Sequence, residues 1–496
     1  MSAVTPAASV LLSRGSGSRE IYVILRGRDL KFFGGFWAFP GGKLTALEAD
    51  SSDQIDARRY AACRELFEET GVLIARRADG TFPPITKDLV ECRRKILDEQ
   101  LPFEGFLAER DLRVDAEDFS LIGEITTPAF APVRYATTFF VAHLPPGQLP
   151  EVWAGELERG EWVDVSEMLA RWYRGDLLTP PSVVTLQTLG DSPVDDAPKL
   201  LGPLFQRLAK SEAIHPIYFA PDVQMVPLRT AALPPSFYTN TYLVGNGPRY
   251  LIDPGPEEAD EQHRLFELLD EQSSAGHAPT AIVLSHHHRD HIGAAAACAQ
   301  RYHLPIWAHP RTAQKLQGQV EIQRHLNDGD RLDLGRCPAD ADRSWFLEVL
   351  HTPGHASGHL VFFEPFYHLL LAGDMVSTVT SMVIAPPDGN LAEYLQSLRR
   401  ARELPSRLLL PSHGNASSLP AQVIDGALEH RAKREQQLLE ALADGPAEIE
   451  EMTARLYRGT PEMLMRFARA QVLAGLLKLQ HDGRARPLDA ERWQAC

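Results

Sequence analysis

The stretch Leu284-Ser285-His286-His287-His288-Arg289-Asp290-His291 decides how the second half of the chain folds. Its pattern, H-x-H-x-D-H, follows a short apolar run at 280–284 that predicts a buried strand. Because side chains alternate along a strand, His286 and His288 point to the same side. Three imidazoles and one carboxylate so close together suit two metal ions of the zinc type.

Three further apolar runs each lead to another candidate ligand. They end before His351-Thr352-Pro353-Gly354-His355, before Gly373-Asp374 and before Ser412-His413-Gly414. An isolated H-x-H is more often an ordinary core or surface feature than a metal site. Ligands that follow several buried strands are what a site on one edge of a sheet requires, so the repetition favours metal binding.

The order H-x-H-x-D-H, T-P-G-H, G-D and S-H-G resembles the metallo-beta-lactamase superfamily, on its hydrolase side with glyoxalase II, over residues 215–418. The resemblance implies an αββα sandwich that binds two Zn²⁺ ions, or Mn or Fe in their place. It assigns His286, His288 and His355 to the first ion. It assigns the second ion to Asp290, His291 and His413, and the bridge to Asp374. Asp253 is then expected to support a ligand rather than to bind metal. We interpret the remaining His287, His351 and His359 as loop or supporting residues.

This ligand set predicts hydrolysis. Two metal ions lower the pKa of a shared water, so that hydroxide forms at neutral pH, and they polarise the bond under attack. Asp290 can orient that water as well as bind metal, so no serine or cysteine nucleophile is needed.

A second motif lies at residues 58–74, in the first third of the chain, where we expect a helix. On it, Glu65, Glu68 and Glu69 have i, i+3 and i+4 spacing and therefore share one face. Three such carboxylates repel one another unless a cation lies among them, and Mg²⁺ or Mn²⁺ suits oxygen ligands. Gly71 is expected to end the helix.

The segments F-P-G-G-K (39–43) and R-E-L-F-E-E-T-G-V (64–72) resemble the Nudix box, within a likeness over about residues 5–190. It looks like the branch that includes coenzyme A diphosphatases. The resemblance implies an α/β/α fold and Mg²⁺-assisted hydrolysis of a nucleoside diphosphate linked to a group X. Fifteen residues, 49–63, separate Glu48 from Arg64 where the box has seven. The extra eight, within 49–56, are expected to form a polar loop, and Glu48 is a weaker ligand candidate. Arg64 would orient the helix glutamates, and the candidate bases are Glu68, Glu69 and Glu158.

After His413 the chain shows helical spacing at 422–443, 448–457 and 461–479, and residues 481–488 resemble a wing. This order resembles the lactamase-beta-like branch, which includes a single-strand endoribonuclease and thioesterases, so two chemistries stay open. Residues 421–496 carry 11 Lys or Arg against 12 Asp or Glu. A solvated face is favoured over a phosphate-binding patch, whose candidates would be Arg466, Arg469, Lys478, Arg484 and Arg486.

The composition of the chain narrows the possible classes of protein further. The net charge of −16 argues against a broad nucleic-acid surface. Five scattered cysteines without a C-x-x-C pair indicate reduced thiols, and neither a signal peptide nor a membrane span is evident. We therefore expect a cytoplasmic enzyme of small-molecule substrates, namely nucleotide or CoA derivatives and thioesters, and an oligomer is compatible with this composition.

These observations predict an α/β multidomain chain. The expected parts are a Nudix domain at 1–190, a linker at 191–214, the metallo-beta-lactamase-fold hydrolase at 215–418 and a winged helix at 419–496. The hypothesis is a two-site hydrolase that cleaves a CoA-type diphosphate and an ester or thioester of the acyl-CoA or glutathione type. One alternative is a single-strand endoribonuclease beside a separate nucleotide clean-up activity, and another is an inactive binding scaffold. The candidate catalytic residues are Asp290, Glu68, Glu69 and Arg64.

Overall fold

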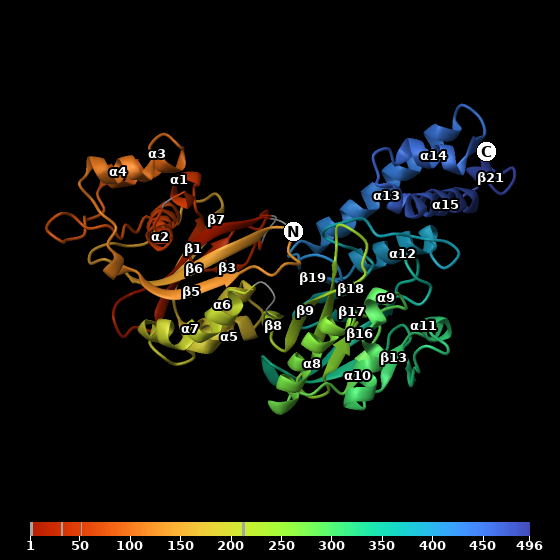
Figure 1. Cartoon of the computed structure of the whole chain (residues 1–496), viewed down its shortest axis with the longest axis horizontal. Coiled ribbons are helices and arrows are strands. Elements are labelled where there is room, and N and C mark those ends of the chain that lie inside the picture. The colour runs from red at the N-terminus through yellow and green to blue at the C-terminus, as the bar shows by residue number, and fades with distance from the viewer. Residues whose placement is uncertain (1–2, 31–32, 51, 211–213) are drawn as a thin grey trace. The chain divides into compact units, whose positions relative to one another are not determined.

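The computed structural model describes residues 3–30, 33–50, 52–210 and 214–496 (Figure 1). The chain divides into two compact units, unit 1 at 1–224 and unit 2 at 225–496. In the part of the chain that the structure describes, no helix is both long enough and apolar enough to cross a membrane.

Unit 1 is built on a mixed sheet with the strand order β3-β2-β1-β6-β5, to which β4 adds beside β1 and β7 beside β2. Strands β1 and β6 run parallel in the centre, and β1 is buried along most of its length because helices cover both faces of the sheet. The strands are β1 (Val4–Ser13), β2 (Glu20–Arg26), β3 (Trp37–Ala38), β4 (Gly41–Lys43), β5 (Ser120–Thr126), β6 (Arg134–His143) and β7 (Leu157–Asp164), and β8 (Ile217–Ala220) follows later in the chain.

Two layers of helices sandwich this sheet. One core contains Leu66 and Phe67 of α2 with Phe106 of α4, and the other contains Trp172 of α5 and Phe205 of α7. The mixed sheet between helices agrees with the α/β/α arrangement that was expected. The helices are α1 (Ala46–Ala49), α2 (Gln54–Thr70), α3 (Lys87–Leu97), α4 (Phe103–Glu109), α5 (Val165–Tyr173), α6 (Pro180–Leu189) and α7 (Ala197–Leu208).

The helix with the glutamates begins earlier than expected. The polar insertion was predicted to be a loop, but Gln54, Ile55 and Asp56 form the first turn of α2, so that prediction is wrong for these residues. The cause is Asp53, whose side chain accepts hydrogen bonds from two backbone N–H groups and caps the helix. Gly71 ends α2 in the left-handed conformation at φ 73°, as predicted.

The segment expected to be a linker contributes to the core of unit 1. Helix α7 forms over 197–208, and Val194, Leu201, Phe205 and Leu208 are buried against the sheet. Residues 211–213, at the end of the expected linker, lie outside the described residues. The division between the two compact units falls between residues 224 and 225, after the expected linker at 191–214.

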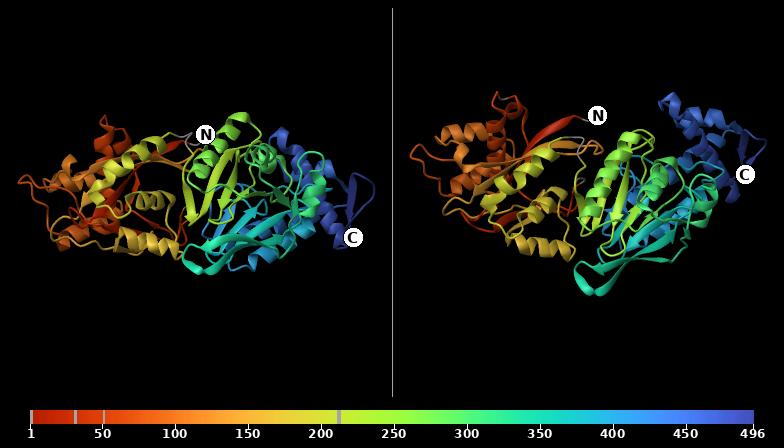
Figure 2. Two further views of the ribbon diagram at one scale, coloured as in Figure 1. Left: turned by 90° about the horizontal axis from the view of Figure 1, so that it is seen from below. Right: turned by 60° about the horizontal axis from the view of Figure 1, so that its bottom comes forward.

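Unit 2 contains two sheets that appear as adjacent layers in Figure 2, with α8 and α10 outside the first sheet. The first runs β14-β13-β12-β11-β10-β9 and the second β15-β16-β17-β18-β19. Strands β10 and β11 pair as an antiparallel hairpin. The strands are β9 (Val223–Arg229), β10 (Tyr238–Val244), β11 (Tyr250–Ile252), β12 (Ala281–Val283), β13 (Ile306–Ala308), β14 (Arg324–His325), β15 (Arg331–Cys337), β16 (Asp340–His351), β17 (Leu360–Glu364), β18 (Leu369–Gly373) and β19 (Leu408–Pro411).

The helices of this part are mostly short and follow individual strands. The apolar runs before the candidate ligands form β12, the end of β16, β18 and β19, as the sequence predicted. Strands β18 and β19 are parallel, which brings the segments that follow them to one edge of the sheet. The helices are α8 (Ala259–Ser274), α9 (Arg289–Ile292), α10 (Ala295–Tyr302), α11 (Pro310–Lys315) and α12 (Leu391–Arg402).

Unit 2 ends in three helices and a small sheet. Helix α13 (Pro420–Leu442) leads to α14 (Ile449–Leu456) and α15 (Met465–His481), and β20 (Ala447–Glu448), β21 (Ala485–Pro487) and β22 (Arg492–Ala495) form the sheet β20-β22-β21. Leu438, Met452, Val472 and Trp493 belong to a core of their own. Ile424 of α13 and Ala474 of α15 instead join the core of the β16–β19 sheet, so this part is attached through apolar packing.

Candidate metal centres

Strand ends and short loops deliver seven candidate ligands to one place in unit 2. His286 and His288 follow β12, and helix α9 carries Asp290 and His291. His355, Asp374 and His413 follow β16, β18 and β19. All seven residues of the predicted set therefore come together, although they are up to 127 positions apart (286 to 413) in the chain.

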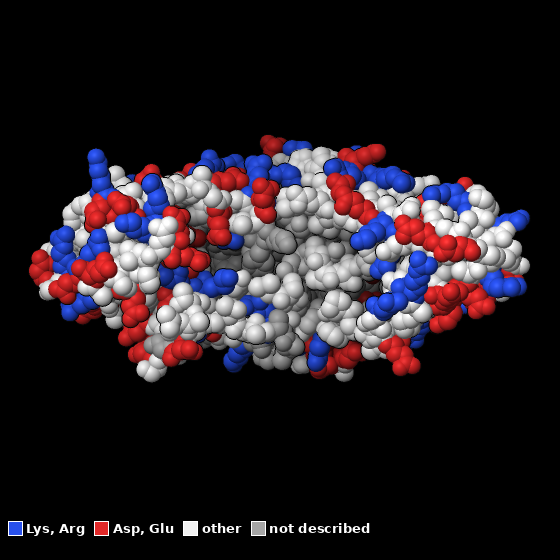
Figure 3. Space-filling view, turned by 90° about the horizontal axis from the view of Figure 1, so that it is seen from above, with Lys and Arg blue, Asp and Glu red and all other residues white. Residues whose placement is uncertain are grey.

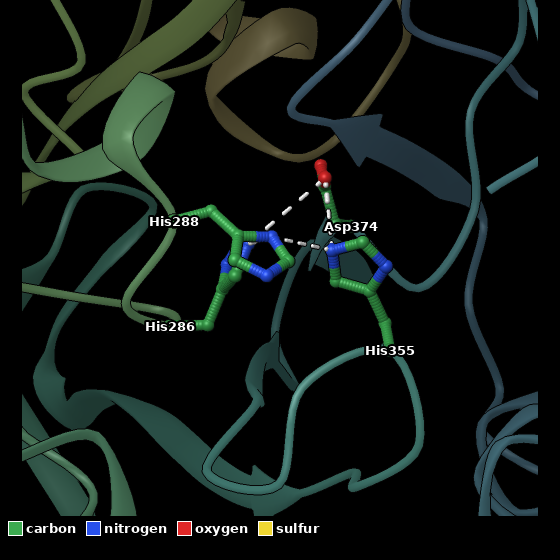
Figure 4. Close-up of side chains that lie close together, drawn as sticks. All are labelled: His286, His288, His355 and Asp374. Atoms are coloured by element: carbon green, nitrogen blue, oxygen red, sulfur yellow. Dashed lines mark hydrogen bonds and ion pairs between the residues drawn. The ribbon is translucent and has the colours of Figure 1, made fainter. Parts of the chain in front are cut away.

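The seven side chains form two groups, in each of which the potential ligand atoms lie within 4.8 Å of one another. Figure 4 shows the first group, in which the rings of His286, His288 and His355 turn nitrogens toward one another and toward Asp374. His288 Nδ1 lies 3.0 Å from His286 Nε2 and 2.9 Å from His355 Nε2. The second group contains Asp290, His291 and His413.

Asp374 lies between the two groups. Its Oδ2 is 3.4 Å from His355 Nε2 and 4.0 Å from His286 Nε2. Its Oδ1 is 3.4 Å from His291 Nε2 and 3.2 Å from His413 Nε2. Each oxygen of one carboxylate thus faces a different group, which is the geometry of a bridging ligand.

A second set of contacts fixes the histidine rings. His355 Nδ1 lies 2.8 Å from the Val383 carbonyl, and His413 Nδ1 lies 2.8 Å from the Tyr238 carbonyl. A carbonyl only accepts, so each Nδ1 must donate, which leaves Nε2, the nitrogen that faces the cluster, as the one available to a metal ion. His291 Nδ1 lies 2.9 Å from Asp253 Oδ2, which agrees with the supporting position predicted for Asp253.

The environment favours neutral imidazole rings in the first group and a protonated His413 beside carboxylates in the second. Burial, with His288 nearby, lowers the pKa of His355 to about 3. Burial alone would also lower the pKa of His413, but Asp374 and Asp290 outweigh it and raise the pKa to about 10. A metal ion would replace the proton in this second group.

Two buried atoms in the cluster, His291 Nε2 and Asp374 Oδ1, lie 3.4 Å apart but make no hydrogen bond of ordinary geometry. An unsatisfied buried nitrogen and oxygen are costly, and coordination to a cation would satisfy both. Together with the imidazole and carboxylate donors, these atoms fit divalent ions of the zinc type.

The three remaining histidines have other partners. His359 Nε2 accepts from the Asp374 backbone N–H at 3.0 Å, and its Nδ1 lies 2.8 Å from Thr352 Oγ1. His351 Nε2 lies 2.9 Å from the Ser357 carbonyl, and His287 Nε2 lies 3.8 Å from Asp388. All three therefore hold loops around the cluster.

The glutamates of α2 in unit 1 are organised around Arg64. Its guanidinium donates to Glu48 Oε1 at 2.8 Å, to Glu65 Oε1 at 2.9 Å and to Glu68 Oε2 at 3.2 Å. It also donates to the Lys43 carbonyl at 2.8 Å, which ties the helix to β4. The position of Arg64 agrees with the orienting role predicted for it.

Glu69 and Glu65 contact Gly41 and Gly42 of β4. Glu69 Oε2 accepts from the Gly41 N–H at 2.8 Å, and a Cβ at Gly42 would lie 2.4 Å from the Glu65 carboxylate. Burial, with Glu68 among its neighbours, raises the pKa of Glu65 to about 7, and burial with Glu65 nearby raises the pKa of Glu69. Glu48 also caps α1 through the Thr45 N–H.

The glutamates do not form a compact ligand group. Within the described residues, only the two histidine-containing groups of unit 2 bring three or more ligand atoms within 4.8 Å. Glu158, the other candidate base, accepts from the Arg28 N–H at 3.1 Å and is exposed. In unit 1 the structure therefore shows carboxylates that are held by an arginine.

Sequence reasoning missed the backbone carbonyls of Val383 and Tyr238. Val383 lies in a loop and Tyr238 begins β10, both remote in sequence from the histidines that they orient, and any residue type could supply a carbonyl. No sequence signal identifies such partners.

Comparisons with known proteins agree with these observations for unit 2. The Metallo-beta-lactamase superfamily profile matches residues 235–413, and the Beta-lactamase associated winged helix domain profile matches residues 449–493. The predicted metallo-beta-lactamase domain and the winged helix after it are thus confirmed. Neither of these two matches covers the residues of the predicted Nudix domain.

Relatives and solved structures are similar to parts of the chain. Beta-lactamase-like protein 2 homolog of Drosophila melanogaster is 28% identical over 258 residues, which are 50% of this chain and 84% of that protein. Hydroxyacylglutathione hydrolase of Rhizobium meliloti is 33% identical over 148 residues, 30% of this chain and 52% of that protein. These relatives support a hydrolase with a metal-binding histidine and aspartate cluster.

Two solved structures can be superposed on different parts of the chain. A metallo-beta-lactamase family protein from Thermus thermophilus has a TM-score of 0.46 and 24% identity, covering 56% of this chain and all (100%) of that one. A NUDIX hydrolase from Alicyclobacillus acidocaldarius has a TM-score of 0.36 and 27% identity, covering 40% of this chain and 98% of that one.

Proposed function

We propose that unit 2 hydrolyses thioesters of small-molecule thiols, of the acyl-CoA or glutathione type, at a two-metal centre. The observation that carries the proposal is the Asp374 carboxylate, whose two oxygens face two separate ligand groups. When bound there, two ions of the zinc type would activate a water and polarise the acyl carbonyl. His286, His288 and His355 would hold one ion, Asp290, His291 and His413 the other, and Asp374 both.

Exposure distinguishes the role of Asp290 from that of its neighbours. Its side chain is 18% exposed, against 0% for His291 and 7% for His413. Asp290 therefore offers a carboxylate oxygen toward solvent while the rings beside it are closed off. In this position it would orient the attacking water and accept its proton.

The relatives support thioesters of small thiols as the class of substrate, and the distribution of charge argues against RNA. The name hydroxyacylglutathione hydrolase describes an enzyme that acts on the acyl conjugate of a small thiol, and it supports this class of substrate for unit 2. Among the cations that could bind RNA, Arg469, Lys478 and Arg484 pair with Glu491, Asp482 and Glu435. Figure 3 shows acidic and basic side chains interspersed on the visible face, which does not favour the endoribonuclease alternative.

For unit 1 we propose Mg²⁺- or Mn²⁺-dependent hydrolysis of a nucleoside diphosphate linked to a group X, with CoA-type compounds as substrates. Glu65, Glu68 and Glu69 would hold the ion, and Arg64 would position Glu65 and Glu68. The supporting observation is that Arg64 joins the carboxylates of Glu65 and Glu68 to the Lys43 carbonyl of β4. Glu68 and Glu69 are the candidate bases.

The two activities can be separated in one experiment. The full-length chain is incubated with an acyl-CoA, Zn²⁺ and Mg²⁺, and the products are identified by mass spectrometry. Free CoA and the free acid report thioester hydrolysis. Acyl-phosphopantetheine and adenosine bisphosphate report diphosphate cleavage.

Variants assign each product to a site. His288→Ala should abolish free CoA and leave diphosphate cleavage, and Glu68→Gln should do the reverse. Matched controls are His277→Ala and Glu91→Gln, which change exposed residues outside both clusters and should retain both products. An intact substrate with metal-loaded wild type would refute the CoA proposal, and cleavage of single-stranded RNA that is lost in His288→Ala would favour the endoribonuclease. A chain that takes up neither metal would point to a binding scaffold.

A further inference from the structure

The winged helix reaches the metal cluster through the segment 382–384. These residues lie outside any strand or helix. The Met382 carbonyl accepts from Arg431 Nη2 of α13 and from Gln471 Nε2 of α15, the latter at 2.9 Å. Gln471 Oε1 in turn accepts from the Ile384 N–H at 3.1 Å. Side chains of the winged helix thus supply the partners that a neighbouring strand would supply in a sheet.

Val383 lies between Met382 and Ile384 and hydrogen-bonds His355, a candidate metal ligand. Its carbonyl accepts from His355 Nδ1 at 2.8 Å. His355 Nε2 then faces His288 Nδ1 at 2.9 Å and Asp374 Oδ2 at 3.4 Å. A shift of the Val383 carbonyl would turn the His355 ring away from the other ligands.

Arg431 has a second route to the cluster through Tyr394 of α12. Its guanidinium carbon lies 5.4 Å from the centroid of the Tyr394 ring, and the Tyr394 hydroxyl donates to the Met375 carbonyl at 2.7 Å. Met375 directly follows Asp374. Gly354 directly precedes His355, and a Cβ at Gly354 would lie 2.3 Å from the Tyr394 Cα. The backbones of Gly354 and Tyr394 are therefore in close contact.

Arg431 and Gln471 are placed to act as a pair. Arg431 is only 5% exposed, and its Nη1 donates to Gln471 Oε1 at 3.3 Å. The buried guanidinium of Arg431 hydrogen-bonds the Met382 carbonyl and the side-chain amide of Gln471, which belong to two different segments. Losing these partners would leave a buried charge without hydrogen bonds and would cost stability. This pair therefore constrains the segment 382–384 more tightly than apolar packing alone.

We propose that Arg431 and Gln471 are positioning residues for the metal centre, because they fix the 382–384 backbone that holds His355 in its ligand orientation. The inference rests on the proposed two-metal function of unit 2. It assigns the winged helix a part in forming the centre, in addition to packing.

Helix α13 offers a matched control one turn further on. Arg434 lies over the Tyr457 ring at 4.5 Å and donates to the Leu456 carbonyl at 2.9 Å. Arg434 therefore has the same residue type and similar contacts as Arg431, but its partners lie within the winged helix. Removing it should disturb the winged helix without moving Val383.

The experiment compares full-length wild type with Arg431→Met, Gln471→Leu and Arg434→Met. Zinc affinity is measured by competition with a chelator, and the visible absorption spectrum of the Co²⁺-substituted protein reports the ligand geometry. Circular dichroism and thermal unfolding show whether each variant is folded. We expect Arg431→Met and Gln471→Leu to weaken zinc binding by about tenfold, at the lower end of effects seen for residues behind the ligands, and to alter the Co²⁺ spectrum.

Arg434→Met should keep the zinc affinity and the spectrum of wild type even where its melting temperature falls. Arg431→Lys, which keeps the charge and one donor, should restore part of the lost affinity and remains informative if Arg431→Met does not fold. Wild-type affinity and spectrum in both Arg431→Met and Gln471→Leu would overturn the inference, as would an equal loss in Arg434→Met. A wild-type chain that binds neither Zn²⁺ nor Co²⁺ would overturn the proposed function together with it.

Discussion

The two candidate centres bring ligands together by opposite means. In unit 2, histidine nitrogens and one shared carboxylate face each other directly, and the protein places no lysine or arginine among the described contacts of Asp374. In unit 1, the Arg64 guanidinium lies among the carboxylates of Glu48, Glu65 and Glu68. Neutral imidazoles can crowd without strong repulsion, whereas ionised carboxylates need a counter-charge.

This difference has a consequence for stability and for metal binding. The unit 2 cluster leaves two buried atoms, His291 Nε2 and Asp374 Oδ1, for a cation to satisfy. The unit 1 cluster already has an internal cation, which holds its carboxylates in place. Unit 2 should therefore bind its metals tightly, and unit 1 should bind Mg²⁺ weakly and chiefly with the substrate phosphates.

Asp374→Asn should have the largest effect, because it removes the charge that both ligand groups share. Thioester hydrolysis should fall by at least about 10³-fold, which corresponds to a loss of roughly 4 kcal/mol of transition-state stabilisation. Steady-state kinetics with an acyl-CoA measures it. Asp425→Asn, which removes an exposed partner of Arg402, is the control and should behave as wild type. Retained activity in Asp374→Asn would refute a shared carboxylate.

Arg64→Ala should produce the next largest effect, and on stability as well as on activity. It leaves the partly buried carboxylates of Glu48, Glu65 and Glu68 without their counter-charge, which should cost unit 1 about 3–5 kcal/mol. Denaturant unfolding measures it. Arg113→Ala, whose side chain is 67% exposed, should change the free energy of unfolding by less than about 1 kcal/mol. Equal effects in the two variants would mean that Arg64 is not an internal counter-ion.

His309 should make unit 2 less stable in acid. Burial, with His351 stacked on the ring and Arg311 nearby, lowers its pKa to about 4. Between pH 6.5 and about 4 the unfolded chain binds this proton and the folded chain does not, so stability falls as the pH falls through that window. The neutral Nδ1 also accepts from the Arg311 N–H, a bond that protonation removes.

The variant His309→Asn should reduce this loss by about 2 kcal/mol between pH 7 and pH 4, because asparagine also caps a helix but does not titrate. Urea unfolding at several pH values measures the slope. His277→Asn, at an exposed position, should keep the wild-type slope. If His309→Asn keeps it too, His309 is not held neutral by the fold.

The smallest effect is expected at the surface of the winged helix. Arg484→Ala removes an ion pair with Glu435 at a site where the arginine is 47% exposed, so stability should change by less than about 1 kcal/mol. Titration with single-stranded RNA at two salt concentrations should show no difference from wild type. A clear loss of salt-dependent RNA binding would instead support the endoribonuclease alternative.

Much of this arrangement could be predicted from the sequence, because it depends on residue type and local period. The apolar runs before His286, His355, Asp374 and His413 predicted the strands, and the structure brings their ligands to one place. The i, i+3, i+4 spacing placed the three glutamates on one helix face. These features need only neighbours along the chain and the rule that strand ends meet at a sheet edge.

The remainder depends on contacts that the sequence does not encode locally. The carbonyl of Val383 could belong to any residue, and Arg431 and Gln471 are ordinary residues of amphipathic helices until folding brings them to Met382. The linker prediction included a short amphipathic helix but did not pack its apolar face, that of α7, in the core of unit 1. The loop prediction for the insertion overlooked Asp53 as a helix cap.

Metal stoichiometry tests the central claim most directly. The full-length chain is loaded with zinc, passed over a desalting column and analysed for metal per chain, beside His355→Ala and His413→Ala. The two-group geometry predicts two zinc ions in wild type and about one in each variant, because each variant removes a ligand from one group only. No zinc in wild type, or two ions retained with full affinity in both variants, would contradict it.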